Sequence, residues 1–135
     1  MKSITVVADD RVGLLADISY LLGKAKINIE YISVDVIAKK AVITITVKDA
    51  DKAKTILHNS GFKVTELNSI VIKLADKPGE LSRITSLLAE GGVNIENVHI
   101  LSKDGNTTIL SLSADKPKKA LKILEEFLVN KEQNT

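Results

Sequence analysis

The sequence predicts an α+β fold of two tandem β-α-β-β-α-β units with antiparallel sheets, and three observations support this prediction. Alternating apolar residues indicate strands, whereas apolar residues three and four positions apart indicate helices. The same order of strands, helices and turns occurs twice within the 135 residues. The second occurrence ends early, in a polar segment. We therefore expect a first unit at residues 1–68 and a second unit at residues 69–135.

The duplication is clearest at two short motifs. The segment Asp10-Arg11-Val12-Gly13 matches Asp76-Lys77-Pro78-Gly79, and Asn28-Ile29-Glu30 matches Asn94-Ile95-Glu96. Both matches lie 66 positions apart, and the apolar residues between the motifs keep the same register. A constant offset over so long a stretch indicates an internal duplication.

In the first unit the expected order of elements is that of the split β-α-β, or ferredoxin-like, fold. Strands are expected at residues 3–8, 27–38, 41–47 and 62–67, with one helix from the first turn to about residue 26 and another at 50–60. Asp10 and Asp49 precede the two helices and are predicted to be N-caps. A phase change in the second strand predicts a bulge or kink at residues 30–31, and residues 39–40 are predicted to form a hairpin turn.

The second unit repeats this pattern from Ile70 onwards, with Asp76 as the predicted N-cap, a bulge or kink at residues 96–97 and a hairpin at residues 103–106. A final helix is expected from about Pro117. Residues 129–134 match the fourth strand of the first unit, but they are too polar for a core strand. The second unit is therefore expected to lack its fourth strand, which leaves the strand from Ile70 to Ala75 at a sheet edge.

Composition argues against several classes of function. The formal net charge is +2 and aromatic residues make up 3% of the chain, which disfavours nucleic-acid binding. There is no cysteine, signal-peptide pattern or membrane-length apolar run, so we expect a cytoplasmic protein without membrane association. No catalytic motif occurs, and His58 and His99 lack further ligands at metal-binding spacing. We expect no enzyme activity, cofactor or metal.

The doubled motifs resemble those of the ACT domain family. Two β-α-β-β-α-β units, each with an Asp-x-x-Gly turn and an Asn-Ile-Glu strand start, are similar to tandem ACT domains over about residues 3–128. ACT domains are small regulatory modules that commonly bind amino acids, pair through their sheets, and lie inside or beside metabolic enzymes. The resemblance implies a stand-alone regulatory protein that binds an amino acid and forms a homodimer.

The resemblance also implies where the ligand binds, at an interface between two ACT units. The site would lie against the turn after the first strand, near the residue that opens the second strand. Carried over to this sequence, the implied ligand-binding residues are Asp10, Arg11, Val12, Gly13, Leu14, Asn28 and Ile29 in the first unit, and Asp76, Lys77, Pro78, Gly79, Glu80, Asn94 and Ile95 in the second.

The chemistry of these residue types suits an amino acid. The first N–H groups of a helix attract a carboxylate, an aspartate pairs with an ammonium group, and asparagine both donates and accepts hydrogen bonds. Each residue also has a structural interpretation. The aspartates are expected N-caps, the glycines allow close packing, the asparagines suit turns, Pro78 fixes a helix start, and Arg11 and Lys77 are solvated charges.

Three hypotheses about function follow. The first is a non-catalytic sensor that binds a small amino acid and regulates a metabolic partner, with a regulatory subunit of an amino-acid biosynthetic enzyme as its nearest variant. The second is a ligand-free protein-interaction module, in which another protein pairs with the exposed sheet edge of the second unit. The third is an RNA-binding ferredoxin-like domain, which the low aromatic content and near-neutral charge disfavour.

Overall fold

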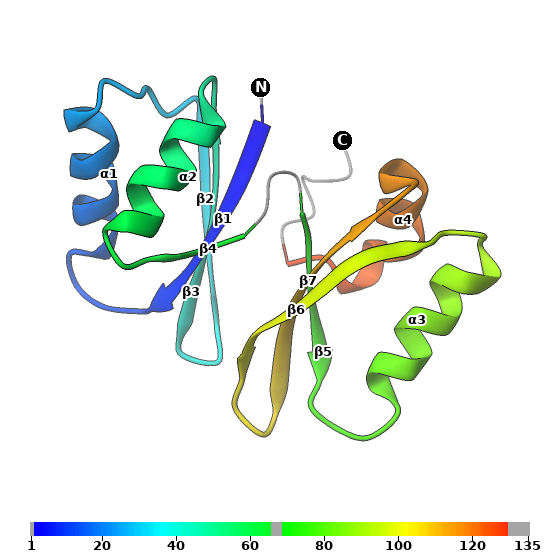
Figure 1. The fold of residues 1–135 in the computed structure, drawn as a ribbon. Coiled ribbons are helices and arrows are strands. Elements are labelled where there is room, and N and C mark those ends of the chain that lie inside the picture. The colour runs from blue at the N-terminus through cyan, green and yellow to red at the C-terminus, as the bar shows by residue number, and fades with distance from the viewer. Residues whose placement is uncertain (1, 66–68, 130–135) are drawn as a thin grey trace. The chain divides into compact units, whose positions relative to one another are not determined.

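The computed structural model describes residues 2–65 and 69–129. The chain divides into two compact units, residues 1–68 and 69–135. Each unit is an α+β sandwich in which two helices cover one face of an antiparallel sheet (Figure 1). No helix among the described residues is long and apolar enough to cross a membrane.

Unit 1 follows the predicted order of elements. Its elements are β1 (Lys2–Asp9), α1 (Leu14–Lys24), β2 (Tyr31–Ile37), β3 (Lys40–Val47), α2 (Ala50–Asn59) and β4 (Lys63–Val64). The strands are ordered β2-β3-β1-β4, so β2 lies at one edge of the sheet. Asp49 caps α2 as predicted, because its carboxylate accepts from the Lys52 N–H at 3.2 Å.

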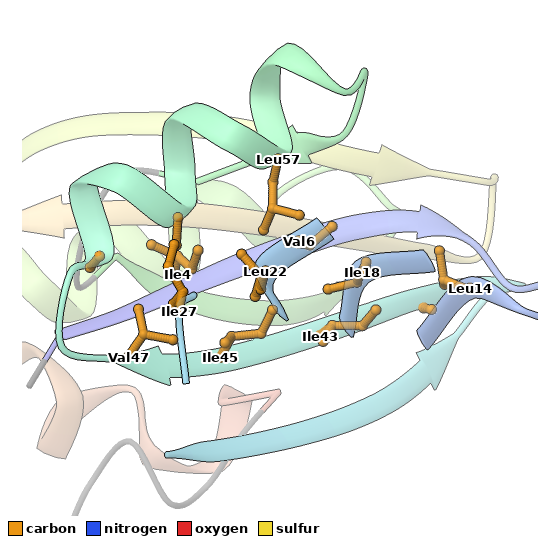
Figure 2. Packing of buried hydrophobic residues seen from close by; sticks show 13 residues of the cluster. Ile4, Val6, Leu14, Ile18, Leu22, Ile27, Ile43, Ile45, Val47 and Leu57 are labelled. Atoms are coloured by element: carbon orange, nitrogen blue, oxygen red, sulfur yellow. The ribbon is translucent and has the colours of Figure 1, made fainter. Parts of the chain in front are cut away.

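The core of unit 1 lies between the sheet and its two helices. Ile4 and Val6 of β1 and alternate residues of β3 point towards the helices, as the period of two requires. Figure 2 shows these side chains meeting Ile18 and Leu22 of α1 and Leu57 of α2, all of which are fully buried. The alternating and helical patterns of the sequence thus converge on one apolar layer.

Unit 2 repeats this architecture with one strand fewer. Its elements are β5 (Ile70–Ala75), α3 (Glu80–Glu90), β6 (Ile95–Lys103), β7 (Thr107–Ala114), α4 (Pro117–Ile123) and a 3₁₀ turn (Glu125–Phe127). The sheet order is β5-β7-β6, so β6 occupies the edge position that β2 holds in unit 1. Its core again combines one sheet face with both helices.

The prediction of fewer strands in unit 2 is confirmed, and the free edge of β5 is covered in part. Ile72 forms an isolated antiparallel bridge with Leu128, and the Val129 N–H donates to the Val71 carbonyl at 3.0 Å. These contacts resemble a fourth strand reduced to its first residues. The rest of the predicted polar segment, residues 130–134, and the end of the predicted fourth strand of unit 1, residues 66–67, lie outside the described residues.

Local geometry at the hairpin and at the edge strands tests three predictions. The hairpin between β2 and β3 turns at Ala38 and Lys39, both with positive φ, and not at residues 39–40. The predicted bulge at residues 96–97 is confirmed by a register shift between Ile95 and Asn97 of β6. At residues 30–31 the kink is found and the bulge is not, because the chain bends at Glu30, before β2 begins at Tyr31, and β2 pairs with β3 in unbroken register.

Candidate functional site

The turn between β1 and α1 holds residues 10–14 at one end of the sheet of unit 1. The Asp10 N–H donates to the Lys39 carbonyl at 3.2 Å, which ties the turn to the β2–β3 hairpin. Gly13 has φ 87° and directly precedes α1. This left-handed conformation is open to glycine at little cost. Val12, at the tip of the turn, is fully exposed, whereas Leu14 is a buried core residue.

The prediction that Asp10 and Asp76 are N-caps is wrong. The residues that precede α1 and α3 are Gly13 and Gly79, and in the described residues no side chain caps either helix. Each aspartate lies three residues before its glycine, at the start of the turn, which is too early to reach the first helical N–H groups. The first N–H group of each helix donates within the turn, from Leu14 to the Arg11 carbonyl at 3.3 Å and from Glu80 to the Lys77 carbonyl at 3.4 Å. The second and third N–H groups of each helix have no acceptor among the described residues and are available to solvent or to a ligand.

In unit 2 the aspartate of the turn is used within the protein. The Asp76 carboxylate accepts from the Lys103 ammonium group and, at 3.0 Å, from the Gly105 N–H of the β6–β7 hairpin. Its side chain is only 11% exposed. Asp76 therefore clamps the turn to the hairpin and has little capacity left for a ligand ammonium group.

In unit 1 the equivalent carboxylate is unoccupied. Within residues 2–65 and 69–129, neither an ion pair nor a side-chain hydrogen bond involves Asp10, which is exposed. The neighbouring cations are paired elsewhere: Arg11 contacts Asp17 at 2.7 Å and Lys40 contacts Asp9. The first turn thus offers a carboxylate, free helical N–H groups and an apolar tip.

The turn of unit 2 carries a further pair of charges. Arg83 donates to the Glu80 carboxylate at 3.0 Å, and this hydrogen bond lowers the pKa of Glu80. The guanidinium group of Arg83 also lies 5.0 Å from the ring centroid of Phe127, at the end of the described chain. Lys77 and Pro78 are exposed. The first turn of α3 is therefore partly engaged in its own contacts.

The two strand-opening asparagines lie at the opposite end of each unit from these turns. Asn28 follows α1, whose 11 residues span about 16 Å. The next residues of the chain meet the far end of β3, where the Glu30 N–H donates to the Thr46 carbonyl at 2.9 Å. The same holds for Asn94 beyond α3, whereas Ile29 and Ile95 pack against the cores. A single unit therefore does not bring its asparagine to its own turn.

The edge strands β2 and β6 each expose a row of apolar side chains on the helix-covered face of their sheets. In β2 this row contains Ile32, Val34 and Val36, which pair with core residues of β3. In β6 the row contains Val98 and Ile100, of which Ile100 is 53% exposed. The alternation of apolar residues predicts these strands, but it does not predict the exposure of the rows. The repeat of the row at equivalent positions of both units is the signal that could have revealed it.

The described residues contain no cluster of three or more histidine, aspartate or glutamate side chains able to hold a metal ion. His58 ends α2 and His99 lies in β6, and both are exposed.

Comparison with known proteins identifies the repeated unit. The family model of the ACT domain matches residues 2–57 and 68–129. A search of the curated proteins gave no match.

Several solved structures are similar to the chain. A protein from Bacteroides thetaiotaomicron is 22% identical, with 98% of this chain and 94% of that chain covered and a TM-score of 0.49. The regulatory subunit of aspartate kinase from Thermus flavus is 20% identical, with 93% and 90% covered and a TM-score of 0.46. The acetolactate synthase small subunit from Thermotoga maritima is 14% identical, with 96% and 89% covered and a TM-score of 0.44.

Proposed function

The chain belongs to the ACT domain family, and on that premise we propose that it is a non-catalytic regulatory protein that binds a small amino acid between ACT units of two copies. The proposal includes a cytoplasmic location and a metabolic enzyme as the regulated partner, because ACT domains commonly lie inside or beside such enzymes. The observation that carries the proposal is the exposed apolar row of the edge strand β2, which ends beside the turn where the Asp10 carboxylate has no partner among the described residues.

The edge strand β2 supports pairing between copies. It is the terminal strand of its sheet, with no further strand beside it in the described part of the chain, and its apolar row at Ile32, Val34 and Val36 is 38%, 40% and 57% exposed. Exposed edges of this kind are templates for a further strand. A second β2 in this position would extend the sheet and bury both apolar rows.

An antiparallel pairing of two β2 strands would also complete the ligand site. Asn28 lies three residues before β2, whereas the turn with Asp10 lies beside the end of β2, at the hairpin. Antiparallel neighbours place the start of one strand beside the end of the other. The Asn28 of one copy would therefore meet the Asp10–Leu14 turn of its partner, which no single unit achieves by itself.

The groups of such a site match the charges of an α-amino acid. The uncapped start of α1 offers N–H donors to the carboxylate, and the unoccupied Asp10 carboxylate suits the ammonium group. The Asn28 side chain can donate and accept at the same time. Since the ligand would contact both copies, its binding would favour the paired state, and this change of assembly is the proposed signal to the partner enzyme.

The test is a thermal-shift screen with the twenty amino acids, followed by calorimetry and sedimentation analysis. A ligand at about 100 times its Kd adds roughly 2.7 kcal/mol to stability, a Tm shift of several degrees. The shift should disappear in Gly13→Val and persist in Gly79→Val. Gly79→Val is the matched control, because the two glycines have φ 87° and 90° and their substitution imposes similar strain. A flat screen on ligand-free protein would overturn the proposal.

A ligand-free interaction module is the second candidate. It is favoured by the β5 edge, where one bridge at Ile72 and the bond from Val129 to Val71 cover only part of the strand. In that case association with a partner protein would not depend on amino acids, and Val36→Asp in β2 would leave it unchanged. The sensor hypothesis predicts instead that association depends on the amino acid and is weakened in Val36→Asp, because this substitution would place charges in the proposed pairing surface.

A further inference from the structure

Unit 1 contains a pocket of about 280 Å³ at the end of the sheet remote from the Asp10 turn. It lies where the chain passes from α1 into β2 and from β3 into α2. We call it the lysine pocket, because three of its seven lining residues are lysines: Lys26, Ile27, Asn28, Glu30, Lys48, Asp49 and Lys52. All seven belong to unit 1.

The equivalent place in unit 2 is occupied by a carboxylate of the protein itself. Asp115 follows β7, and its side chain accepts from the Asn94 N–H at 2.9 Å. The Asp115 N–H donates to the Asn94 carbonyl at 3.0 Å, so that the two residues are held together by two hydrogen bonds. Unit 2 therefore shows that the backbone at this junction leaves room for a carboxylate that accepts a hydrogen bond from the N–H of the strand-opening asparagine.

Unit 1 has a lysine in place of this aspartate. Asn28 matches Asn94, and Lys48, directly after β3, matches Asp115. The Asn28 N–H has no acceptor among the described residues of the protein. The same junction thus loses its internal carboxylate, keeps the N–H donor, and gains an ammonium group in the lining of the pocket. This combination suits a carboxylate from outside the chain.

The backbone at Lys26 supports a role for its side chain. Lys26 has φ 60°, whereas the matching residue of unit 2 is Gly92, with φ 75°. A side chain in this left-handed conformation costs about 1–2 kcal/mol, which glycine avoids. Unit 1 therefore bears a local strain that places a lysine in the lining of the pocket, and such strain is typical of functional positions.

The other charges of the pocket leave these two lysines available. Lys52 donates from its ammonium group to the Ala25 carbonyl at 3.2 Å, and the Asp49 carboxylate accepts from the Lys52 N–H as the cap of α2. Glu30 is the remaining acidic residue of the lining. Neither Lys26 nor Lys48 has an ion pair within residues 2–65 and 69–129.

We infer that the lysine pocket of unit 1 binds a carboxylate group of a small molecule, at the position that the Asp115 carboxylate occupies in unit 2. The Asn28 N–H would donate to it, and Lys26 and Lys48 would neutralise its charge. The pocket shares Asn28 with the proposed amino-acid site but does not depend on it. The carboxylate can belong to an acidic amino acid or to a free dicarboxylate.

Titrations followed by ¹⁵N–¹H NMR at constant ionic strength separate these sources. The probes are aspartate and glutamate, succinate and glutarate, and the amides asparagine and glutamine. Saturable downfield movement of the Asn28 amide proton with any of the four acids supports the pocket, and the Asn94 amide, already bonded to Asp115, is the internal control. No movement with any of the four acids overturns it. A pocket filled by succinate in a protein that binds no amino acid would refute the proposed function alone.

Exchange of Lys48 and Asp115, which occupy matching positions of the two units, tests whether this difference determines carboxylate binding. Lys48→Asp should weaken binding about tenfold or more, since it removes a charge-assisted contact and supplies an internal acceptor for Asn28. The reciprocal Asp115→Lys should allow the Asn94 amide to respond to the same acids. Lys118→Asp makes the same charge change at an exposed position of α4 and should leave the responses of the Asn28 and Asn94 amides unaltered. Equal loss in Lys48→Asp and Lys118→Asp would show non-specific attraction and overturn the inference.

Discussion

Units 1 and 2 each have a core built from matching positions, but they differ at both ends of the candidate site. Matching apolar positions of the helices and strands are buried in both units. In unit 2, however, Asp76 is tied to the next hairpin and Asp115 is tied to Asn94. In unit 1, Asp10 is unoccupied and Lys48 lines a pocket. The duplication thus kept the packing and changed the polar contacts, which leaves unit 1 as the more suitable half for binding.

The largest expected effect tests whether the two cores are equivalent. Leu22 and Leu88 occupy matching positions of α1 and α3, and both are completely buried. Leu22→Ala and Leu88→Ala should each lower the free energy of unfolding by about 3 kcal/mol, through lost apolar burial and a residual cavity. Urea unfolding followed by circular dichroism measures both. A loss below about 1 kcal/mol in only one variant would contradict the equivalence.

The next effect separates the two aspartates of the turns. Asp76→Ala leaves Lys103 and the Gly105 N–H without their acceptor at a site where the side chain is 11% exposed. It should cost about 1–3 kcal/mol in the free energy of unfolding. Asp10→Ala breaks no side-chain contact and should stay within about 0.5 kcal/mol of the parent protein. Urea titration of the two variants under identical conditions is the measurement, and equal losses would contradict the comparison.

A smaller effect concerns the junction after the first helix of each unit. Lys26→Gly should raise the free energy of unfolding by up to about 1 kcal/mol, because it relieves the positive φ of a residue with a Cβ. Gly92→Ala introduces the same strain in unit 2 and should lower it by a similar amount. Differential scanning calorimetry would detect both as Tm shifts of opposite sign. A loss of stability in Lys26→Gly would show that the lysine is held there by packing.

Most of the fold was predictable because it depends on apolar periodicity. The alternation of residues in β1 and β3 and the spacing of Ile18 and Leu22 report directly on the buried face of each element. The missing strand of unit 2 was predictable for the same reason, since residues 129–134 lack apolar alternation. Two helix caps were misassigned, because a glycine with positive φ, and not the aspartate three residues earlier, directly precedes each helix.

The candidate site was predictable only in part, because its contacts join segments that are distant in sequence. Nothing near Asp76 shows that Lys103 will reach its carboxylate, since that contact depends on how the hairpin folds back. Likewise, the family resemblance places Asn28 and Asp10 at the same ligand, but α1 separates these two residues within a unit. The substitution of Lys48 for Asp115 is visible in the sequence, yet its meaning required the hydrogen bond between Asp115 and Asn94.

The smallest expected effect compares two carboxylates beside the hairpins. A hydrogen bond and the charge of Lys40 lower the pKa of Asp9 in unit 1, whereas backbone N–H groups of Thr107 and Asn106 lower the pKa of Asp104 in unit 2. Because both pKa values are lowered in the folded state, each carboxylate stabilises the protein above its unfolded pKa of about 4, and this contribution disappears as pH falls through the folded value.

Salt should distinguish these two causes. At 1 M salt the Debye length falls to about 3 Å, which screens the exposed pair of Asp9 and Lys40 but leaves hydrogen bonds from a local backbone turn in place. The folded pKa of Asp9 should therefore move up towards its ordinary value, while that of Asp104 stays lowered. Carboxyl ¹³C titration by NMR at low and high salt measures both groups in one sample. An equal rise at both positions would mean that the Asp104 turn is held by charge, and that the two hairpins are electrostatically alike after all.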